Sequence, residues 1–225
     1  MKIEILFPEV CNLYGDSGNV MLLENTLKKA NIIKTTLLDE PYFVKNDVNF
    51  IYMGPATPNN QKKVLEKLMP YKERLKELIN KGVVFLFTGN ALEIMGKSIN
   101  GDAALDIFDY ESFIDEGSRY TSLFIGKYKG LKNEIVGYKA QSSNSNVSSN
   151  YLFNCIKEKN IKDEGIHINN FYGTNLLGPI LVLNPYFTKK LLSLIGYNGN
   201  LYIEDELITA YKIRLKEFKN ENTKY

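Results

Sequence analysis

The chain has 225 residues, 44% of them apolar and 24% charged, with a formal net charge of +2. Lysines are scattered among acidic residues, so the charge pattern indicates neither a nucleic-acid partner nor a membrane surface, and no apolar run is long enough to span a bilayer. Glu4 and Pro8 interrupt the first apolar stretch, so we do not expect it to be a signal peptide. Cys11 and Cys155 lie far apart without metal-ligand spacing, so we expect a cytoplasmic protein without disulfide, metal or cofactor.

In the first half of the chain, short β-rich runs alternate with helical patterns, which is typical of an α/β sheet. Strands are expected at Ile3–Phe7, Ile32–Leu38, Asn49–Met53 and Val83–Phe87. Helices are expected at Val20–Ala30 and at Gln61–Lys81, the second broken at Pro70 and ended by Gly82. The continuous apolar run Val83–Phe87 suits a central parallel strand that is buried on both faces.

The second half is less regular. Tyr120–Tyr128 and Glu134–Ala140 predict an antiparallel pair, and Ile166–Tyr172 alternates like a strand. We expect a loop at Gln141–Asn150, a short helix at Tyr151–Lys159, a helix that starts at Asn184-Pro185, and a last helix over Glu204–Phe218. No linker divides the chain, so one domain over residues 1–225 is expected.

A sharp turn follows the apolar strand, at Thr88-Gly89-Asn90, before a helix-like segment Ala91–Met95. A nucleophile elbow has this form: one side chain on a tight turn after a buried strand, beside backbone N–H groups at a helix start. Thr88 is the residue expected on that turn. The alternative is an ordinary strand–glycine–helix turn, which is common in α/β folds.

Two further groups of polar residues could bind a small molecule. Tyr14, Asp16 and Asn19 lie in the first loop after a strand, a position that faces a ligand crevice in open α/β sheets. Capping of the following helix is the other role for Asp16. Asn90 and Glu93 lie beside the turn, and Asn90 could equally cap the short helix there.

Four sequence blocks, in order along the chain, carry a resemblance. They are Asn12-Leu-Tyr-Gly-Asp-Ser-Gly-Asn-Val20; Gly54 to Gln61; Leu105-Asp106; and Gly173-Thr-Asn-Leu-Leu-Gly-Pro-Ile-Leu181 followed by Asn184-Pro185. Together they resemble class I glutamine amidotransferases of the cobyric-acid-synthase (cobalamin) type, and within that family the glutaminase subunits that amidate the cell-wall precursor lipid II. The resemblance implies a three-layer, flavodoxin-like α/β fold with a largely parallel central sheet and an antiparallel extension. It also implies a Mur-ligase-like synthetase partner and a pocket for glutamine or another small polar ligand, to which we assign Gly54, Gly89, Asn90, Tyr14 and Asp16.

At several positions that correspond to the family's catalytic residues, this sequence has a different residue. Where the family has its nucleophilic cysteine we place Thr88, and where it has its histidine base we place Leu177. Pro55 occupies the middle of the glycine loop that supplies an oxyanion-hole N–H in the family, and proline has no N–H. His167, the single histidine of the chain, is expected in a core or edge position, and both cysteines are expected to be small buried hydrophobic residues.

Three functions stay open on this basis. The first is a catalytically deficient subunit, a pseudoenzyme that acts with a synthetase. The second is an active amidotransferase of altered chemistry that uses Thr88 or a base supplied by the partner. The third is a plain binding module in which side chains such as Phe87, Leu92 and Leu177 fill the old site.

Overall fold

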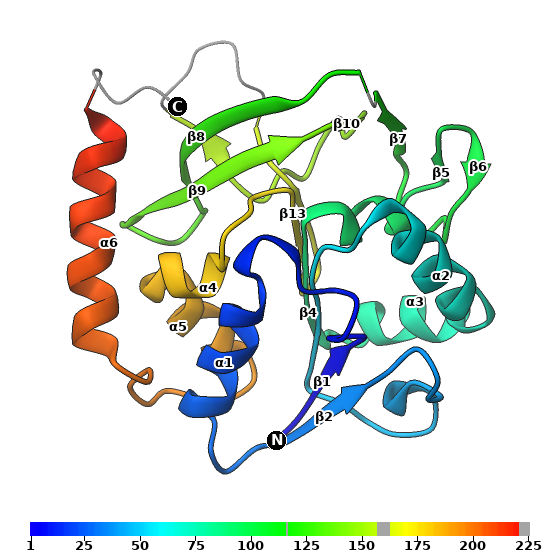
Figure 1. Cartoon of the computed structure of the whole chain (residues 1–225). Helices are drawn as coiled ribbons and strands as arrows, with labels where there is room; N and C mark the ends of the chain where they lie inside the picture. Colours follow the sequence, from blue (N-terminus) through cyan, green and yellow to red (C-terminus); the bar gives the residue numbers. More distant parts are fainter. Residues whose placement is uncertain (116, 157–162, 221–225) are drawn as a thin grey trace.

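A six-stranded sheet forms the centre of the computed structural model, which describes residues 1–115, 117–156 and 163–220. The strand order is β12-β13-β4-β3-β1-β2 (Figure 1). The strands are β1 (Lys2–Leu6), β2 (Asn31–Thr35), β3 (Phe50–Met53), β4 (Val84–Thr88), β12 (Ile166–Ile168) and β13 (Phe171–Thr174). Neighbouring strands from β13 to β2 pair in parallel, and β12 pairs with β13 antiparallel at one edge.

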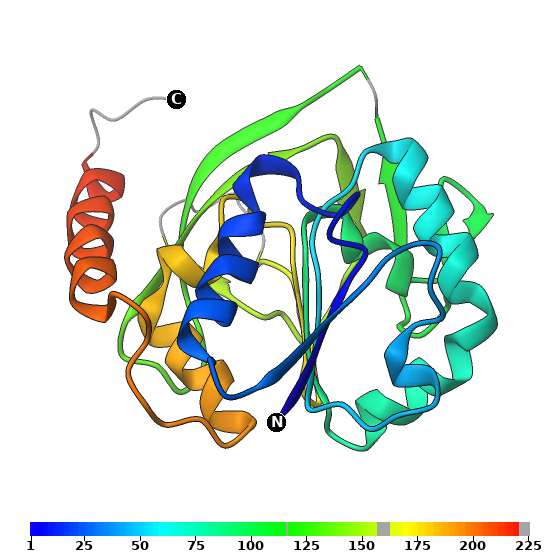
Figure 2. The same ribbon diagram turned by 60° about the horizontal axis from the view of Figure 1, so that its bottom comes forward.

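Helices cover both faces of this sheet. They are α1 (Ser17–Thr26), α2 (Pro58–Leu68), α3 (Lys72–Asn80), α4 (Ile180–Leu183) and α5 (Pro185–Leu194), and α6 (Glu204–Lys219) lies outside these layers. Figures 1 and 2 show α1, α4 and α5 on one face and α2 and α3 on the other. None of the helices in the described ranges is both long and apolar enough to cross a membrane.

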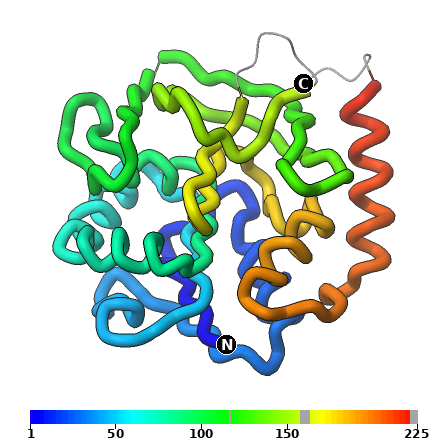
Figure 3. Tube along the Cα trace, turned by 180° about the vertical axis from the view of Figure 1, so that it is seen from behind, coloured from blue at the N-terminus to red at the C-terminus, as the bar shows by residue number. Residues whose placement is uncertain are grey.

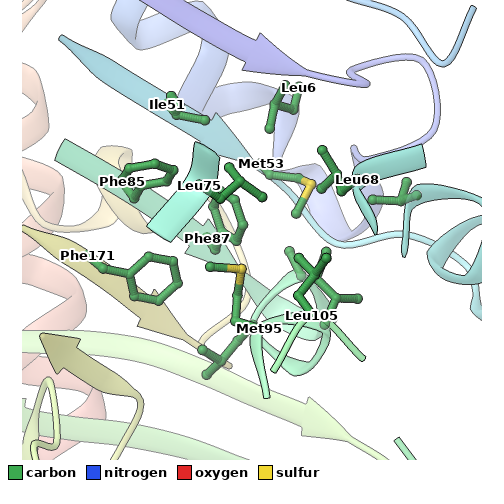
Figure 4. Close-up of a cluster of buried hydrophobic side chains, with 14 of the residues drawn as sticks. Leu6, Ile51, Met53, Leu68, Leu75, Phe85, Phe87, Met95, Leu105 and Phe171 are labelled. Atoms are coloured by element: carbon green, nitrogen blue, oxygen red, sulfur yellow. The ribbon is translucent and has the colours of Figure 1, made fainter. Parts of the chain in front are cut away.

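The central strands alternate between two cores. On β4, Phe85 and Phe87 join the cluster under α2 and α3, whereas Val84 and Leu86 join the cluster under α1 and α5. Figure 4 shows the first cluster, in which Phe171 of β13 packs at ring-centroid distances of 6.0 Å and 5.4 Å from Phe85 and Phe87. Burial on both faces explains why this strand is an uninterrupted apolar run.

Two smaller sheets lie beyond the carboxyl ends of the central strands. One contains β8 (Tyr120–Lys127), β9 (Glu134–Gln141) and β11 (Asn154–Cys155) in the order β11-β8-β9, and the other contains β5 (Ser98–Ile99), β6 (Asp102–Ala103), β7 (Glu111–Ile114) and β10 (Ser143–Ser145) in the order β10-β7-β5-β6. Leu123, Ile125 and Val136 of the β8–β9 pair pack against Tyr211 and Phe218 of α6. Figure 3 shows α6 along one side of the molecule.

The predicted fold class is confirmed: a largely parallel central sheet between helical layers, with an antiparallel addition. The break of the second helix at Pro70 is also confirmed, since α2 and α3 are separated by a 3-10 turn over Met69–Tyr71. Gly82 follows α3 at φ +81°, the left-handed conformation that suits a helix end.

Several predicted elements of the second half were wrong. Ile166–Tyr172 is not one strand but the start of the hairpin β12–β13, which turns at Asn169 with φ +53°. The expected loop 141–150 contains β10, which pairs with β7. Residues 151–156 of the expected helix hold β11 instead, so Cys155 is on a strand and not in a helix, and residues 157–159 of that prediction lie outside the described ranges.

The first helix and the segment after the turn also differ from expectation. α1 begins at Ser17, inside the expected loop, and ends at Thr26. The expected helix-like segment Ala91–Met95 is not an α-helix but falls in two short 3-10 helices, Gly89–Ala91 and Glu93–Met95. Asn184 precedes α5 as predicted, but its side chain bonds both backbone groups of Val136 on β9 and does not cap the helix.

Candidate functional site

The candidate site is a cavity of about 300 Å³ at the carboxyl ends of the central strands. The loops after β3, β4 and β13 contribute Pro55, Gly89 and Leu177, and the strand β9 closes the cavity from the side of the small sheet. Carboxyl ends of parallel strands meet at one sheet edge, which is where open α/β folds bind ligands.

Gly89 is the residue at the bend after β4. Its φ is +57°, whereas Thr88 before it has φ −118° and ψ 150°, the geometry of the last residue of a strand. A left-handed φ is strained for any residue with a Cβ and is relaxed for glycine. The structure therefore places Gly89, and not Thr88, at the bend where an elbow side chain would stand.

Thr88 points away from the cavity. Its side chain is fully buried and does not line the cavity. The hydroxyl donates to the Asp16 carboxylate, at 3.1 Å from Oδ1 and 3.2 Å from Oδ2. The expectation that Thr88 stands on the turn is therefore corrected, because alternation along β4 turns its side chain inward.

Pro55 and Leu177 close over the bend. A Cβ built on Gly89 would lie 2.6 Å from Cβ of Pro55 and 3.3 Å from Cδ2 of Leu177. Real Cβ atoms do not approach another carbon to 2.6 Å, so a side chain at position 89 requires the Pro55 loop to move. Leu177 thus lies beside the bend, as predicted, but next to Gly89.

Asp16 is part of a buried network below the cavity. It is 2% exposed and accepts hydrogen bonds from the hydroxyls of Tyr52 and Thr88 and from the Asn19 side-chain amide. Burial raises the pKa of Asp16 to about 6, and these three donors oppose the rise. Asp16 makes no capping bond to α1, so the expected capping role was wrong.

Gly54 also lies below the cavity, where a Cβ would overlap Asp16 Oδ2 and the Cys11 carbonyl oxygen. Close packing is therefore what this glycine provides. Of the residues that the sequence indicated as catalytic or ligand-binding, Tyr14, Gly89, Asn90, Glu93 and Leu177 line the cavity, and Asp16, Asn19, Gly54 and Thr88 do not.

Asn90 holds the loop after β3 in place. Its side chain accepts from the N–H of Ala56 at 2.9 Å and donates to the carbonyl of the same residue at 2.9 Å. This reciprocal pair, and not a helix cap, is the role of Asn90. Pro55 has no N–H, and the Ala56 N–H already donates to Asn90, so neither of these two residues can donate a backbone hydrogen bond to an oxyanion.

The other wall of the cavity is polar and acidic. The Gln61 side-chain amide donates to the Asn90 carbonyl and to Glu93 Oε2, both at 2.8 Å, and the Ser143 hydroxyl donates to Glu93 Oε1. Glu93 is 2% exposed, and burial raises its pKa. The sequence could not show the partnership with Ser143, because Ser143 lies on the unexpected strand β10.

Arg119 lies at the rim. Its guanidinium is 5.7 Å from the centroid of the Tyr14 ring, and Nη2 is 3.4 Å from the Tyr14 hydroxyl. Both residues are exposed. The sequence gives no indication of this role for Arg119, since a lone arginine before a strand carries no local signal.

The cysteines and the histidine lie away from the cavity. Cys11 is buried as expected, and burial followed by the charges of Glu9 and Asp16 raises its pKa to about 12. His167 is on the edge strand β12, stacked on Tyr172 at 4.4 Å between ring centroids, and burial lowers its pKa. Its core or edge position is confirmed. The residues that line the cavity include neither a cysteine nor a histidine.

No group of three or more His, Cys, Asp or Glu side chains that could hold a metal ion occurs within residues 1–115, 117–156 and 163–220. The cavity offers three kinds of group to a ligand. It has acceptors at Glu93, a cation at Arg119, and apolar walls at Pro55 and Leu177.

Two curated relatives match most of the chain. It is 28% identical over 192 residues to the lipid II isoglutaminyl synthase (glutamine-hydrolyzing) subunit GatD of Staphylococcus aureus (strain N315), covering 80% of this chain and 78% of that protein. It is 23% identical over 207 residues to the GatD subunit of Streptococcus pneumoniae (strain ATCC BAA-255 / R6), covering 86% and 79%. No family model matches the chain.

Solved structures agree on the fold. PurLQS from Thermotoga maritima superposes with a TM-score of 0.55 at 11% identity, covering 95% of this chain and 98% of that one. A structure described as a glutamine amidotransferase superposes with a TM-score of 0.60 at 12% identity, covering 87% and 99%. A glutamine amidotransferase of Thermotoga maritima gives 0.55 at 7% identity, covering 96% and 97%. The chain thus has a glutamine amidotransferase-like, flavodoxin-like fold.

Proposed function

We propose that this chain is a catalytically deficient, ligand-binding subunit of glutamine amidotransferase type, which acts with a synthetase partner. The observation that carries the proposal is the bend after β4. Its residue is Gly89, which has no side chain, and Pro55 and Leu177 occupy the space beside it.

Glutamine hydrolysis by a covalent route needs a nucleophile, a base and an oxyanion hole. Gly89 offers no nucleophile, Leu177 cannot accept a proton, and neither Pro55 nor Ala56 has a free backbone N–H. Loss of a single oxyanion donor typically lowers the rate by about 10²–10³, and groups that act as one unit are not additive. Residual hydrolysis should therefore be negligible.

The partner is proposed from the relatives. Both are subunits of a lipid II isoglutaminyl synthase, so a Mur-ligase-like synthetase and a cytoplasmic step of cell-wall precursor synthesis fit better than a role in cobalamin synthesis. In this proposal the cavity keeps a small polar ligand, glutamine or another, without converting it.

One contact favours the second candidate, an active enzyme that uses Thr88. The Thr88 hydroxyl donates to Asp16, and a hydroxyl next to a carboxylate can lose its proton to it. Against this, the hydroxyl is fully buried and lies outside the cavity lining.

An ammonia-release assay with glutamine tests both candidates on purified wild type and Thr88→Ala, each alone and with a Mur-ligase-like synthetase. We expect no release above the heat-denatured control in any sample. Release by the isolated wild type that Thr88→Ala abolishes would establish the second candidate. Release that needs the synthetase would mean that the partner supplies the missing base.

Thr88→Cys serves as a matched control, because its thiol would face Asp16 and not the cavity. It should stay inactive. The triple variant Gly89→Cys/Pro55→Gly/Leu177→His puts a thiol and an imidazole on the cavity side. It is the one variant of this set from which we expect weak glutamine hydrolysis.

A further inference from the structure

The buried carboxylate of Glu93 has only neutral donors. The Gln61 amide and the Ser143 hydroxyl hydrogen-bond its two oxygens. Within the described ranges no lysine, arginine or histidine forms an ion pair with it. Burial without an opposite charge raises the pKa of Glu93 and so favours its neutral form, and a cationic group from outside the chain would stabilise the carboxylate instead.

A second acceptor in the same wall has no partner. Gln141 donates through Nε2 to the Ser143 carbonyl at 2.8 Å, which fixes the orientation of the amide. Its Oε1 atom is the one side-chain nitrogen or oxygen atom in the described ranges that is buried without a hydrogen bond. Such an orphan acceptor indicates that a donor is missing from the wall. Glu93 and Gln141 both line the cavity.

The rim carries the opposite charge. Arg119 lines the same cavity, is exposed, and stacks on Tyr14. Among the residues that the structure describes, no carboxylate forms an ion pair with Arg119. Guanidinium is the group best suited to hold a carboxylate with two hydrogen bonds.

We infer that the cavity binds an amino acid with a cationic side chain, whose side-chain nitrogen lies against Glu93 and Gln141 and whose carboxylate lies at Arg119. The volume of about 300 Å³ admits a ligand of that size. A neutral carboxamide can donate to the same acceptors but does not stabilise the charged form of Glu93 as a cation does. This inference rests on the proposed function, because it takes the cavity to be a binding site and not a reaction centre.

Isothermal titration calorimetry of the full chain tests it with four probes. L-lysine carries both charged ends, L-norleucine lacks the side-chain ammonium, cadaverine lacks the carboxylate, and L-glutamine has a neutral side chain. Because a hydrogen bond to a charged group is worth roughly 1.5–3 kcal/mol, we expect L-lysine to bind about tenfold tighter, or more, than the other three.

Two variants test which residue binds the side-chain ammonium of L-lysine and which binds its carboxylate. Glu93→Gln keeps the size of the side chain and should bring L-lysine down to the affinity of L-norleucine. Arg119→Met should remove the difference between L-lysine and cadaverine. Glu206→Gln, an exposed carboxylate of α6, is the matched control and should bind like wild type.

Three results would overturn the inference: no binding of any probe by wild type, equal binding of L-glutamine and L-lysine, or unchanged L-lysine affinity in Glu93→Gln. The wild-type series decides the matter even if a variant fails to fold. None of these results bears on glutamine hydrolysis, so the proposed function fails or stands separately, in the ammonia assay.

Discussion

A side chain placed at the bend after β4 should lower the free energy of unfolding, and steric overlap with Pro55 should account for most of the loss. In Gly89→Cys the new Cβ would lie 2.6 Å from Pro55 Cβ, on a residue with φ +57°. Two separate effects therefore act on the free energy of unfolding: the left-handed backbone and the steric overlap.

The two effects have different sizes. A left-handed conformation costs a residue with a Cβ roughly 1–2 kcal/mol. Overpacking in a close-packed site costs typically about 1–3 kcal/mol. Gly89→Cys should thus lower the free energy of unfolding by about 2–5 kcal/mol, and Pro55→Gly in the same chain should recover the steric part.

Urea unfolding of wild type, the two single variants and the double variant measures this as a double-mutant cycle. Gly101→Cys is the matched control, since Gly101 has φ +85° and nothing within 4 Å of a built Cβ. It should show the backbone cost alone, roughly 1–2 kcal/mol. A Gly89→Cys variant no less stable than Gly101→Cys, or one with no coupling to Pro55→Gly, would refute the reasoning.

The remaining predictions concern buried charges. Burial raises the pKa of Asp16 to about 6, above its unfolded value of about 3.9, so the native state holds this proton more tightly than the unfolded state does. The free energy of unfolding should therefore fall by up to ~3 kcal/mol as the pH rises from about 4 to about 6. Asp16→Asn should remove that fall, as measured by urea unfolding across this range. Glu4→Ala should lose about 3–5 kcal/mol in the same measurement at pH 7, because fully buried Glu4 accepts from the Thr35 hydroxyl and from two backbone N–H groups. Lys139→Met should lose about 3–5 kcal/mol, since it leaves Glu164, 2% exposed, without its cation, and Glu164→Gln in the same chain should restore part of the loss.

Each of these has a contradicting result. A wild type and an Asp16→Asn variant with parallel pH profiles would mean that Asp16 does not titrate between those values. A Glu4→Ala variant within about 1 kcal/mol of wild type would mean that water replaces the carboxylate. Equal losses in Lys139→Met and in the Lys139→Met/Glu164→Gln double variant would mean that the loss does not come from an unpaired charge.

The sequence predicted the parallel half of the fold well because its strands are buried on both faces. Ile3–Phe7, Asn49–Met53 and Val83–Phe87 match β1, β3 and β4 to within a residue. Continuous apolar runs bounded by loops leave little choice of structure. The last helix, with acidic residues in its first turn, was predicted as well as these strands.

The small sheets could not be predicted in the same way. Ser143–Ser145 has low β-propensity and becomes a strand because β7 offers its backbone for pairing. The turn at Asn169 splits an alternating run that looks like one strand. Both depend on residues distant in the sequence, which local patterns do not report.

The sequence indicated loops that line the cavity, but it did not indicate which residue lies at the bend after β4. A resemblance in sequence aligned Thr88 with the nucleophile, whereas the backbone puts the bend at Gly89. One residue of register on a strand turns a side chain from the cavity to the core. Asp16 was also misinterpreted from its residue type: aspartate is typical of helix caps, but here its carboxylate accepts hydrogen bonds in a buried network.

Covalent labelling with a glutamine analogue tests most directly the claim that the bend carries no nucleophile. 6-Diazo-5-oxo-L-norleucine alkylates a nucleophile that attacks the glutamine side chain, and peptide mass spectrometry locates the adduct. We predict no adduct on residues 88–90 of wild type, and an adduct at position 89 of the Gly89→Cys/Pro55→Gly/Leu177→His variant. A stoichiometric adduct on Thr88 of the wild-type chain would contradict the account.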